Sequence, residues 1–295
     1  MKNLLFIYNP KSGKMLINEY MDEIIDYFSQ NGYFTTAYAT QSAGDARCKV
    51  EEYGENFDEI IVSGGDGTLD EVVSGALKAG IKPTIGYIPT GSTNDFAKSL
   101  NIPQDIELAK NIALKGKIKD LDVGKLEGKF FTYVAAFGSI AQVSYETDQT
   151  MKNIFGRSAY IFEGMRSISN LKSYKVKITI DGEVMEDEYI HGMVTNSVSV
   201  GGFTKIIGEN VGLDDGIFEL MLVKNPKSII DLNQIIAGLS NHKENDFVTF
   251  KEGRSFKFET EEDLSWTLDG EYGGKTKICD IEVLHKMVKI RTGLV

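Results

Sequence analysis

The chain has 295 residues, of which 42% are hydrophobic and 25% are charged, and its formal net charge is −11. This length suffices for one large hydrophobic core or two smaller ones. The acidic balance disfavours a protein that binds nucleic acid over its whole surface, because phosphate contacts need Lys and Arg side chains. The sequence has no run of about 18 apolar residues, so we expect no membrane-spanning helix.

Two further features concern the compartment. Cys48 and Cys279 lie far apart and have no metal-ligand spacing, so we expect two buried thiols in a reducing cytosol. The N-terminal apolar run is short and is interrupted by Asn9 and Pro10. This interruption favours a first β-strand over a signal peptide.

The first part of the chain alternates between predicted strands and predicted helices. Apolar runs typical of buried strands occupy residues 4–8, 34–40, 59–63 and 83–89. Helices are predicted after them at residues 17–28, 45–53, 68–80, 96 onward and 106–115. This alternation is typical of an α/β domain with a parallel sheet.

Three polar loops follow strands of this part. Residues 9–14, NPKSGK, lack the upstream glycine of a Walker P-loop, and a plain turn explains them equally well. Residues 60–76, IIVSGGDGTLDEVVSGA, place three glycines around Asp66 before a helix, which predicts a phosphate cradle. Residues 90–95, TGSTND, are either a capping cluster or a third ligand loop. Parallel strands present their carboxyl ends at one edge, so we expect the three loops to converge.

The second part of the chain reads as mostly antiparallel β structure. Alternating segments lie at residues 130–136, 174–180, 189–196, 217–223, 255–259 and 281–284. The boundary between the two parts is predicted near Leu121. The last strand, at residues 288–292, could return to the first domain, and the sequence leaves this open.

A basic stretch lies within the second part at residues 152–177. Its cations are Lys152, Arg157, Arg166, Lys172, Lys175 and Lys177, with apolar residues between them. It is either a surface for anionic lipid headgroups or a core-facing helix with a solvated basic face.

Two acidic turns remain. Residues 214–216, DDG, form either a hairpin turn or an oxygen-ligand site for a hard cation. Residues 268–271, LDGE, read as an ordinary turn, although a general base for a hydroxyl would also have this form. The three histidines have no Ser, Cys or Asp arrangement around them, so a nucleophilic triad is not expected.

Five motifs run along the chain in a fixed order: NPKSGK at residues 9–14, GGDGTLDE at 64–71, PTGSTNDF at 89–96, LDDG at 213–216 and LDGE at 268–271. Together they resemble the diacylglycerol kinase catalytic-domain family, most closely its bacterial soluble lipid kinases, which are related to sphingosine kinases. GGDGT alone is less specific, because NAD kinases and phosphofructokinases carry similar turns. PTGSTND and the terminal LDGE favour a lipid kinase.

The resemblance implies two domains. Residues 1–121 would form an α/β ATP-binding domain, which the C-terminal strand at 287–295 could join. Residues 122–286 would form an all-β sandwich that binds the lipid substrate.

The resemblance also implies the site residues. Asp66 and Asp95 would support a catalytic Mg²⁺, and Glu271, with Asp269 beside it, would activate the lipid hydroxyl. A structural Mg²⁺ would be held by the side chain of Asp215 and by the carbonyls of Gly212 and Ile217. The implied ATP contacts are Asn9, Pro10, Lys11, Ser12, Gly13, Lys14, Met15, Thr40, Gly65, Asp66, Gly67, Thr68, Leu69, Asp70, Glu71 and Ser92.

The resemblance implies ATP-dependent phosphorylation of a lipid hydroxyl. The reaction expected first of all converts diacylglycerol to phosphatidic acid. The alternatives are a kinase of a soluble acceptor such as NAD, and a non-catalytic regulator that binds nucleotide or lipid. The family usually has Asn at the position of Asp70. Asp70 would add a negative charge beside the phosphates. We expect a cytoplasmic protein that visits the membrane surface transiently, with no nucleic-acid partner, and the sequence leaves a homodimer open.

Overall fold

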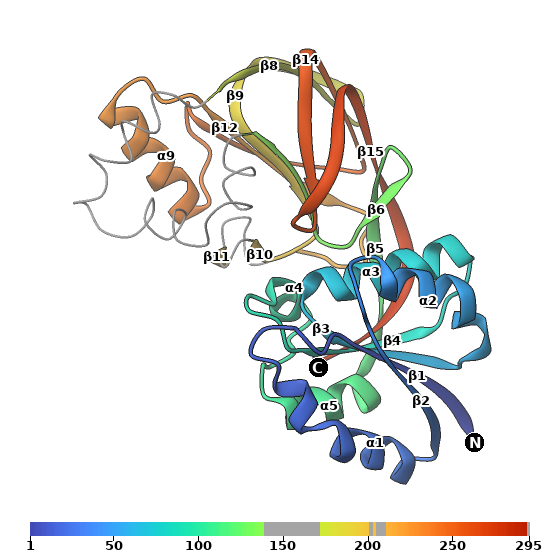
Figure 1. The fold of residues 1–295 in the computed structure, drawn as a ribbon. Coiled ribbons are helices and arrows are strands. Elements are labelled where there is room, and N and C mark those ends of the chain that lie inside the picture. Colours follow the sequence, from blue (N-terminus) through green and yellow to red (C-terminus); the bar gives the residue numbers. More distant parts are fainter. Residues whose placement is uncertain (139–171, 201–202, 205–210, 294–295) are drawn as a thin grey trace. The chain divides into compact units, whose positions relative to one another are not determined.

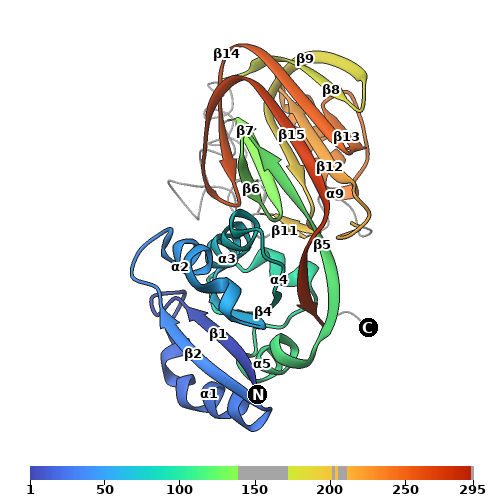
Figure 2. The ribbon, with the colours of Figure 1, turned by 90° about the vertical axis from the view of Figure 1, so that its right-hand side faces the viewer.

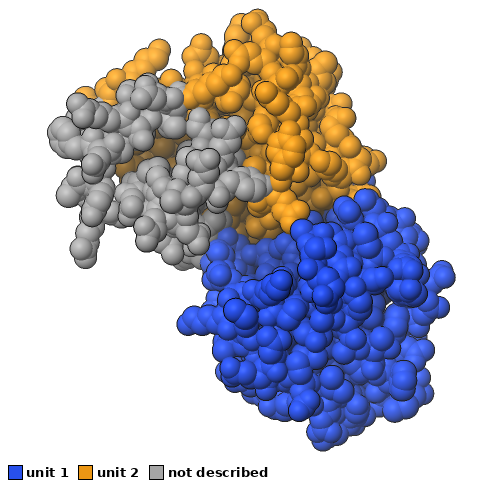
Figure 3. All heavy atoms as spheres, viewed as in Figure 1, with its two compact units in different colours: residues 1–123, 213–215, 284–295 blue, residues 124–212, 216–283 orange. Residues whose placement is uncertain are grey.

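The computed structural model describes residues 1–138, 172–200, 203–204 and 211–293, and these residues form two units. Unit 1 comprises residues 1–123, 213–215 and 284–295, and unit 2 comprises residues 124–212 and 216–283 (Figure 3). The first crossing between them therefore lies after Val123, close to the boundary expected near Leu121. Residues 213–215 belong to unit 1, although the sequence placed them in the second domain.

Unit 1 is built on a parallel sheet with the order β4-β3-β1-β2. Its strands are β1 (Lys2–Tyr8), β2 (Tyr33–Ala39), β3 (Glu59–Gly64) and β4 (Thr84–Pro89). Its helices are α1 (Met21–Gln30), α2 (Asp45–Tyr53), α3 (Asp66–Ala79), α4 (Asp95–Ser99) and α5 (Ile106–Lys115), with short 3-10 turns at Leu16–Glu19 and Gly54–Asn56. The C-terminal part of β15 adds to the sheet in parallel beside β4, at Lys289 and Ile290.

Helices cover both faces of this sheet. Figure 1 shows α1 and α5 on one face and α2 and α3 on the other. β3 is buried at every position, as expected for a strand covered on both faces. Close backbone approaches are built with glycine, because a Cβ at Gly86 would lie 2.2 Å from the Ala113 carbonyl oxygen and one at Gly75 would lie 2.7 Å from that of Arg47.

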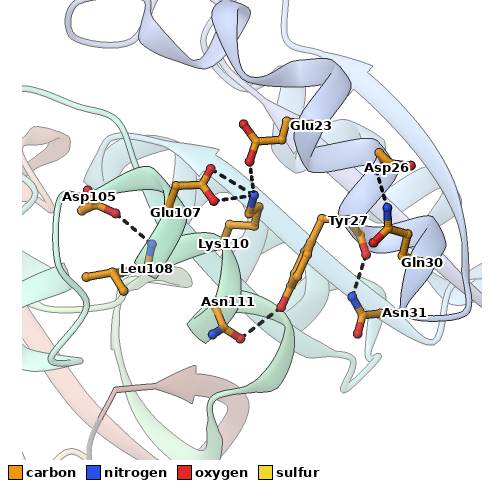
Figure 4. A network of polar contacts seen from close by, with 10 residues as sticks. All are labelled: Glu23, Asp26, Tyr27, Gln30, Asn31, Asp105, Glu107, Leu108, Lys110 and Asn111. Carbon is orange, nitrogen blue, oxygen red and sulfur yellow. Dashed lines mark hydrogen bonds and ion pairs between the residues drawn. The ribbon is translucent and has the colours of Figure 1, made fainter.

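A polar network joins α1 to α5 (Figure 4). The ammonium group of Lys110 is almost fully buried and lies 2.6 Å from Glu23 Oε1 and 2.8 Å from Glu107 Oε2. The ring of Tyr27 lies beside the same ammonium group, and its hydroxyl donates to the Asn111 side chain at 3.0 Å. Two carboxylates satisfy the buried cation, so the network holds two helices together on one face of the sheet.

Unit 2 is an antiparallel β structure. Its strands are β5 (Lys117–Leu126), β6 (Lys129–Phe131), β7 (Val134–Gly138), β8 (Tyr174–Ile180), β9 (Glu183–Thr195), β10 (Ser199–Val200), β11 (Phe203–Thr204), β12 (Phe218–Lys224), β13 (Val248–Gly253), β14 (Ser255–Leu268) and β15 (Glu271–Thr292). The first residues of β5 and the last residues of β15 belong to unit 1, and the two strands pair with each other (Figure 2).

Long strands that change partners close the unit 2 core. β9 pairs with β8 through its first half and with β7 through its second half, and β14 does the same. Trp266 is fully buried, and its ring packs edge-on against Phe137 and Phe258 at centroid distances of 5.1 and 5.0 Å. Aromatic side chains of this kind bury large apolar areas, so they contribute strongly to the packing of the core.

The structure corrects two expectations. Helix α9 (Ile229–Asn241) lies within the second part, for which the sequence predicted mostly β structure and the resemblance implied an all-β sandwich. Cys48 is exposed, whereas Cys279 is buried as expected, and burial raises the pKa of its thiol. Among the described residues, no helix is long and apolar enough to cross a bilayer.

The described part of the basic stretch is not a free cationic surface. Lys175 and Lys177 lie on β8 and form ion pairs with Glu186 at 2.9 Å and Glu259 at 3.2 Å on the neighbouring strands. Lys172 pairs with Glu262. The remaining cations of the stretch, at positions 152–166, lie outside the described residues.

His191 gives unit 2 a specific pH dependence. Burial lowers the pKa of this imidazole to about 4, and its Nδ1 lies 2.8 Å from the Phe137 carbonyl oxygen. The unfolded state binds the proton more tightly. The contribution of neutral His191 to the free energy of unfolding is therefore fully present above about pH 6.5 and is lost as the pH falls toward 4. We expect the loss to reach roughly 3 kcal/mol, because each pKa unit corresponds to about 1.4 kcal/mol.

Urea unfolding of the wild type and of His191→Gln at pH 7 and pH 4.5 measures this contribution. The variant should lose less stability than the wild type between the two pH values, whereas His242→Gln, at an exposed histidine, should behave like the wild type. Equal pH dependence in the wild type and His191→Gln would contradict the assignment.

Candidate active site

The loops that follow the parallel strands meet at one edge of the unit 1 sheet. The Asn9 amide donates to the Ser63 carbonyl at 2.8 Å, the Thr40 amide to the Tyr8 carbonyl at 2.9 Å, and the Thr90 amide to the Gly64 carbonyl at 2.8 Å. Each loop is therefore tied to the end of a neighbouring strand. The convergence expected for the three polar loops is present, and the loop at Thr40 joins them.

The loop at residues 9–15 presents two lysines beside a buried hydroxyl. Lys11 and Lys14 are exposed, whereas Ser12 is 7% exposed. The Asn9 side chain accepts the Lys11 amide at 2.9 Å, and the Pro10 carbonyl accepts the Asn18 side-chain amide at 3.1 Å. Met15 follows in the left-handed region, with a φ of 58°. The loop is thus shaped by its own polar groups while its cations point to solvent.

Glycines allow this loop and the two others to touch. A Cβ at Gly13, which has a φ of +52°, would lie 2.3 Å from the Thr90 carbonyl oxygen. A Cβ at Gly91 would lie 2.6 Å from the Gly65 Cα. Real Cβ contacts do not come this close, so both positions require glycine for steric reasons.

Asp66 joins the N-terminal ends of two helices. It is the first residue of α3, and its carboxylate accepts the Asp95 amide at 2.9 Å and the Phe96 amide at 3.2 Å, at the start of α4. The Asp95 side chain is 3% exposed and accepts Lys98 Nζ at 3.0 Å. Helix N-terminal amides favour negative charge, so this arrangement holds two carboxylates close to an anion-binding edge.

These carboxylates fit a magnesium ion that is bound together with phosphates. Among the described residues, no group of three or more His, Cys, Asp or Glu side chains could hold a metal by itself. Mg²⁺ is usually bound by one or two carboxylates, with phosphate oxygens and water completing the octahedron. Asp66 and Asp95 supply carboxylates of this kind.

Tyr87 is a buried residue that forms hydrogen bonds to the loops at the same edge of the sheet. Its ring is fully buried, and its hydroxyl donates to the Gly64 carbonyl at 3.3 Å and to the Asn94 side chain at 3.4 Å. Burial and the nearby Asp66 carboxylate raise the pKa of this hydroxyl well above its usual value. The hydroxyl therefore stays protonated and acts as a fixed donor beneath both loops.

The remaining residues of the glycine motif have different surroundings. The Leu69 side chain is fully buried in the core, so only its backbone faces the edge, and Thr68 packs under Gly64. The Glu71 carboxylate accepts the amides of Gly44 and Ala46 at 2.7 and 3.0 Å. Gly65 precedes α3 as its N-cap, Gly67 and Asp70 are partly exposed, and Ser92 is exposed.

In unit 2, the LDGE motif is a tight hairpin turn. Leu268 pairs with Glu271, and the two residues between them, Asp269 and Gly270, have φ values of 48° and 88°. Positive φ at both central positions is the signature of a type I′ turn, for which Asp-Gly is a preferred sequence. The turn ends β14, begins β15 and leaves Glu271 exposed.

Asp269 is held by four donors. Its carboxylate accepts the amides of Tyr133 and Val134 at 3.0 and 2.8 Å, and both the amide and the hydroxyl of Thr132 at 2.5 and 2.7 Å. Its own amide donates to the Val134 carbonyl at 2.8 Å. The side chain is 5% exposed. Asp269 therefore fixes the turn that carries Glu271.

The DDG motif also forms a turn, at residues 213–216. Asp215 is exposed, and Gly216 has a φ of 77°. The Leu213 carbonyl accepts the amide of Asp122, a fully buried residue. A carboxylate and backbone carbonyls are the oxygen donors that a hard cation prefers, so the chemistry of this turn fits the magnesium site that the motif suggests.

Two site residues were missed from the sequence. Lys98 lies three residues after Asp95 on α4, a spacing that places the two side chains together and could have been noticed. Thr132 is 137 positions from Asp269, and no local pattern links residues so far apart. Glu271 and Asp269 belong to unit 2, whereas the glycine motif belongs to unit 1.

Comparisons with known proteins place the chain among characterised families. Residues 3–126 match the model of the diacylglycerol kinase catalytic domain, and residues 133–291 match that of the YegS C-terminal NAD kinase beta sandwich-like domain. A Staphylococcus aureus protein named diacylglycerol kinase is 36% identical over 277 residues, which cover 93% of this chain and 87% of that protein.

Solved structures agree. A crystal structure described as a diacylglycerol kinase from Bacillus anthracis is 28% identical, has a TM-score of 0.78, and covers 99% of this chain and 97% of its own. A second structure from the same organism is 30% identical, with a TM-score of 0.81 and the same coverage. These matches confirm the α/β domain followed by a β-sandwich-like domain.

Proposed function

Because the chain belongs to the diacylglycerol kinase family and is a kinase, we propose that it transfers the γ-phosphoryl group of ATP to a lipid hydroxyl, that of diacylglycerol first of all. The observation that carries the proposal is the single edge of unit 1 at which the glycine loops, two helix N-termini and the lysine-bearing loop meet. Phosphoryl transfer depends mainly on positioning and charge stabilisation, and this edge supplies both.

In the proposed reaction, the backbone of residues 9–15 and 65–68 surrounds the ATP phosphates. Amides at the start of α3 favour the negative charge, and Lys14, which is exposed on the adjacent loop, neutralises part of it. Thr40 and Ser92 complete the nucleotide contacts. A magnesium ion held through Asp66 and Asp95 would neutralise charge on the phosphate oxygens, and a second would brace the turn at Asp215, Gly212 and Ile217.

The proposed general base is Glu271. Its exposed carboxylate would accept the proton as the lipid hydroxyl attacks the γ-phosphorus. Asp269 takes part as a positioning residue, because its carboxylate already accepts four hydrogen bonds within unit 2. This role refines the catalytic one that the resemblance implied for it.

The proposal includes a transient, peripheral encounter with the membrane surface, since diacylglycerol resides in the bilayer. We place the enzyme in the cytoplasm, where ATP is available, and keep a homodimer as part of the proposal. The proposal includes no nucleic-acid partner. Within the described part of the basic stretch, Lys172, Lys175 and Lys177 form ion pairs with carboxylates.

The test is transfer of labelled γ-phosphate from ATP, with Mg²⁺, to a panel of acceptors. Diacylglycerol, monoacylglycerol and a sphingoid base are presented in mixed micelles, beside NAD and a blank without acceptor. The proposal expects labelled lipid and no labelled NADP. Labelled NADP would indicate a soluble-acceptor kinase, and ATP binding without any product would indicate a regulator.

Gly13→Ala is expected to weaken ATP binding by about tenfold or more, equivalent to ~1.4 kcal/mol. The added methyl would collide with the Thr90 carbonyl oxygen and displace the loop that carries Lys14. The matched control is Gly32→Ala, whose φ is also positive but whose Cβ would meet nothing within 4 Å. Titration with a fluorescent ATP analogue compares the two, and equal affinities would contradict the proposed contact.

A further inference from the structure

Glu71 reaches from α3 to the start of α2. One carboxylate oxygen accepts the Gly44 amide at 2.7 Å, and the other accepts the Ala46 amide at 3.0 Å. Gly44 is the N-cap of α2 and has no side chain to cap the helix. Glu71 therefore supplies from another helix the acceptor, and the negative charge, that a helix N-terminus requires.

The segment at residues 40–44 lies between two fixed points. At one end, the Thr40 amide donates to the Tyr8 carbonyl at 2.9 Å, and the Gln41 amide donates to the Asp45 carboxylate at 2.8 Å. At the other end, Glu71 holds Gly44 and Ala46. One carboxylate thus couples this loop to the glycine-motif helix.

We propose that Glu71 is a positioning residue for nucleotide binding, which holds the Thr40 loop in register with the glycine motif instead of contacting ATP. The inference rests on the proposed function, since it concerns the same nucleotide site. It differs from the role that the resemblance implied, because the carboxylate accepts from the loop's own amides. It also explains why the sixth residue of α3 is a Glu. A contact with the negatively charged phosphates of ATP would not require a long acidic side chain at this position.

Replacing the carboxylate with an amide leaves one acceptor oxygen and sets an NH₂ group against a backbone N–H. A hydrogen bond to a charged group stabilises more than one between neutral groups, and more free energy is lost when its partner stays unsatisfied. The loop would then move away from its bound position, and ATP binding would have to restore the order.

The test compares Glu71→Gln and Glu71→Asp with the wild type. Both should raise the KM for ATP by about tenfold or more, the size of a lost charge-assisted hydrogen bond, while kcat at saturating ATP changes by no more than about twofold. The Asp variant keeps the charge but shortens the side chain, so it separates hydrogen-bond reach from charge. Glu51→Gln is the control, because the contacts of Glu51 among the described residues are surface ion pairs, with Arg47 and Lys78.

Hydrogen exchange of the ATP-free protein provides the independent readout. The Gly44 and Ala46 amides should exchange faster in both Glu71 variants than in the wild type and in Glu51→Gln. Unchanged exchange, or faster exchange with an unchanged KM, would overturn this inference alone. A wild type that binds no ATP would overturn the proposed function together with it.

Discussion

Glu271→Gln is expected to lower kcat about 10²- to 10⁴-fold, the contribution typical of a general base. The amide cannot accept the proton of the attacking hydroxyl, yet it has the shape of the carboxylate and suits the same hairpin position. ATP affinity should stay within about twofold of the wild type, because the proposed nucleotide contacts lie in unit 1 and Glu271 lies in unit 2.

Glu282→Gln is the matched control for this variant. Glu282 lies on the same strand, β15, and within the described part of the chain its carboxylate forms an exposed ion pair with Lys125 at 3.9 Å. Its replacement should leave kcat unchanged, since such surface pairs contribute little. Wild-type turnover in Glu271→Gln would remove Glu271 from the base role and would leave the nucleotide site of unit 1 intact.

Asp269→Ala is expected to destabilise unit 2 by about 3–5 kcal/mol. It removes the acceptor of three backbone amides and one hydroxyl inside the protein, and buried donors without partners are costly. It also places Ala at a φ of 48°, where Asp and Asn are better tolerated. Asp269→Asn keeps this tolerance and one acceptor oxygen, and should lose about 1–3 kcal/mol.

Urea unfolding followed by tryptophan fluorescence measures these losses directly, because Trp266 is the chain's one tryptophan and is fully buried in the unit 2 core. Asp181→Ala is the control. Asp181 has a φ of 47° and also accepts backbone amides, those of Arg254 and Ser255, but its turn is exposed. Water can replace its hydrogen bonds, so a smaller loss of about 1 kcal/mol is expected. Equal losses of stability in Asp181→Ala and Asp269→Ala would contradict the larger contribution assigned to the buried hydrogen bonds of Asp269.

Much of unit 1 could be predicted because its signals are local. The α2 and α5 bounds match the predicted helices at residues 45–53 and 106–115. Gly44 and Gly54 flank α2, and the capping residue Asp105 and Gly116 flank α5. The convergence of the loops followed from the parallel order of the strands alone. The role proposed for Glu71 could not be predicted in this way, because its partners Gly44 and Ala46 lie 27 and 25 positions away.

Unit 2 was harder to predict for a physical reason. The strand predicted at residues 130–136 is interrupted at Thr132 and Tyr133, whose amides bond to Asp269 instead of to a neighbouring strand. The ion pairs of Lys175 and Lys177, in the described part of the basic stretch, could not be predicted because their acidic partners are set by strand register. Helix α9, in contrast, carries a readable start signal, the capping box of Ser228 and Asp231.

The central claim is tested most directly by following the γ-phosphoryl group itself. ATP with isotope-labelled γ-phosphoryl oxygens is incubated with the enzyme, Mg²⁺ and diacylglycerol micelles, and the lipid fraction is analysed by mass spectrometry. The account predicts phosphatidic acid that carries the label in its phosphoryl group and an unlabelled oxygen in the bridge to glycerol. Label released only as inorganic phosphate, with diacylglycerol unchanged, would contradict it.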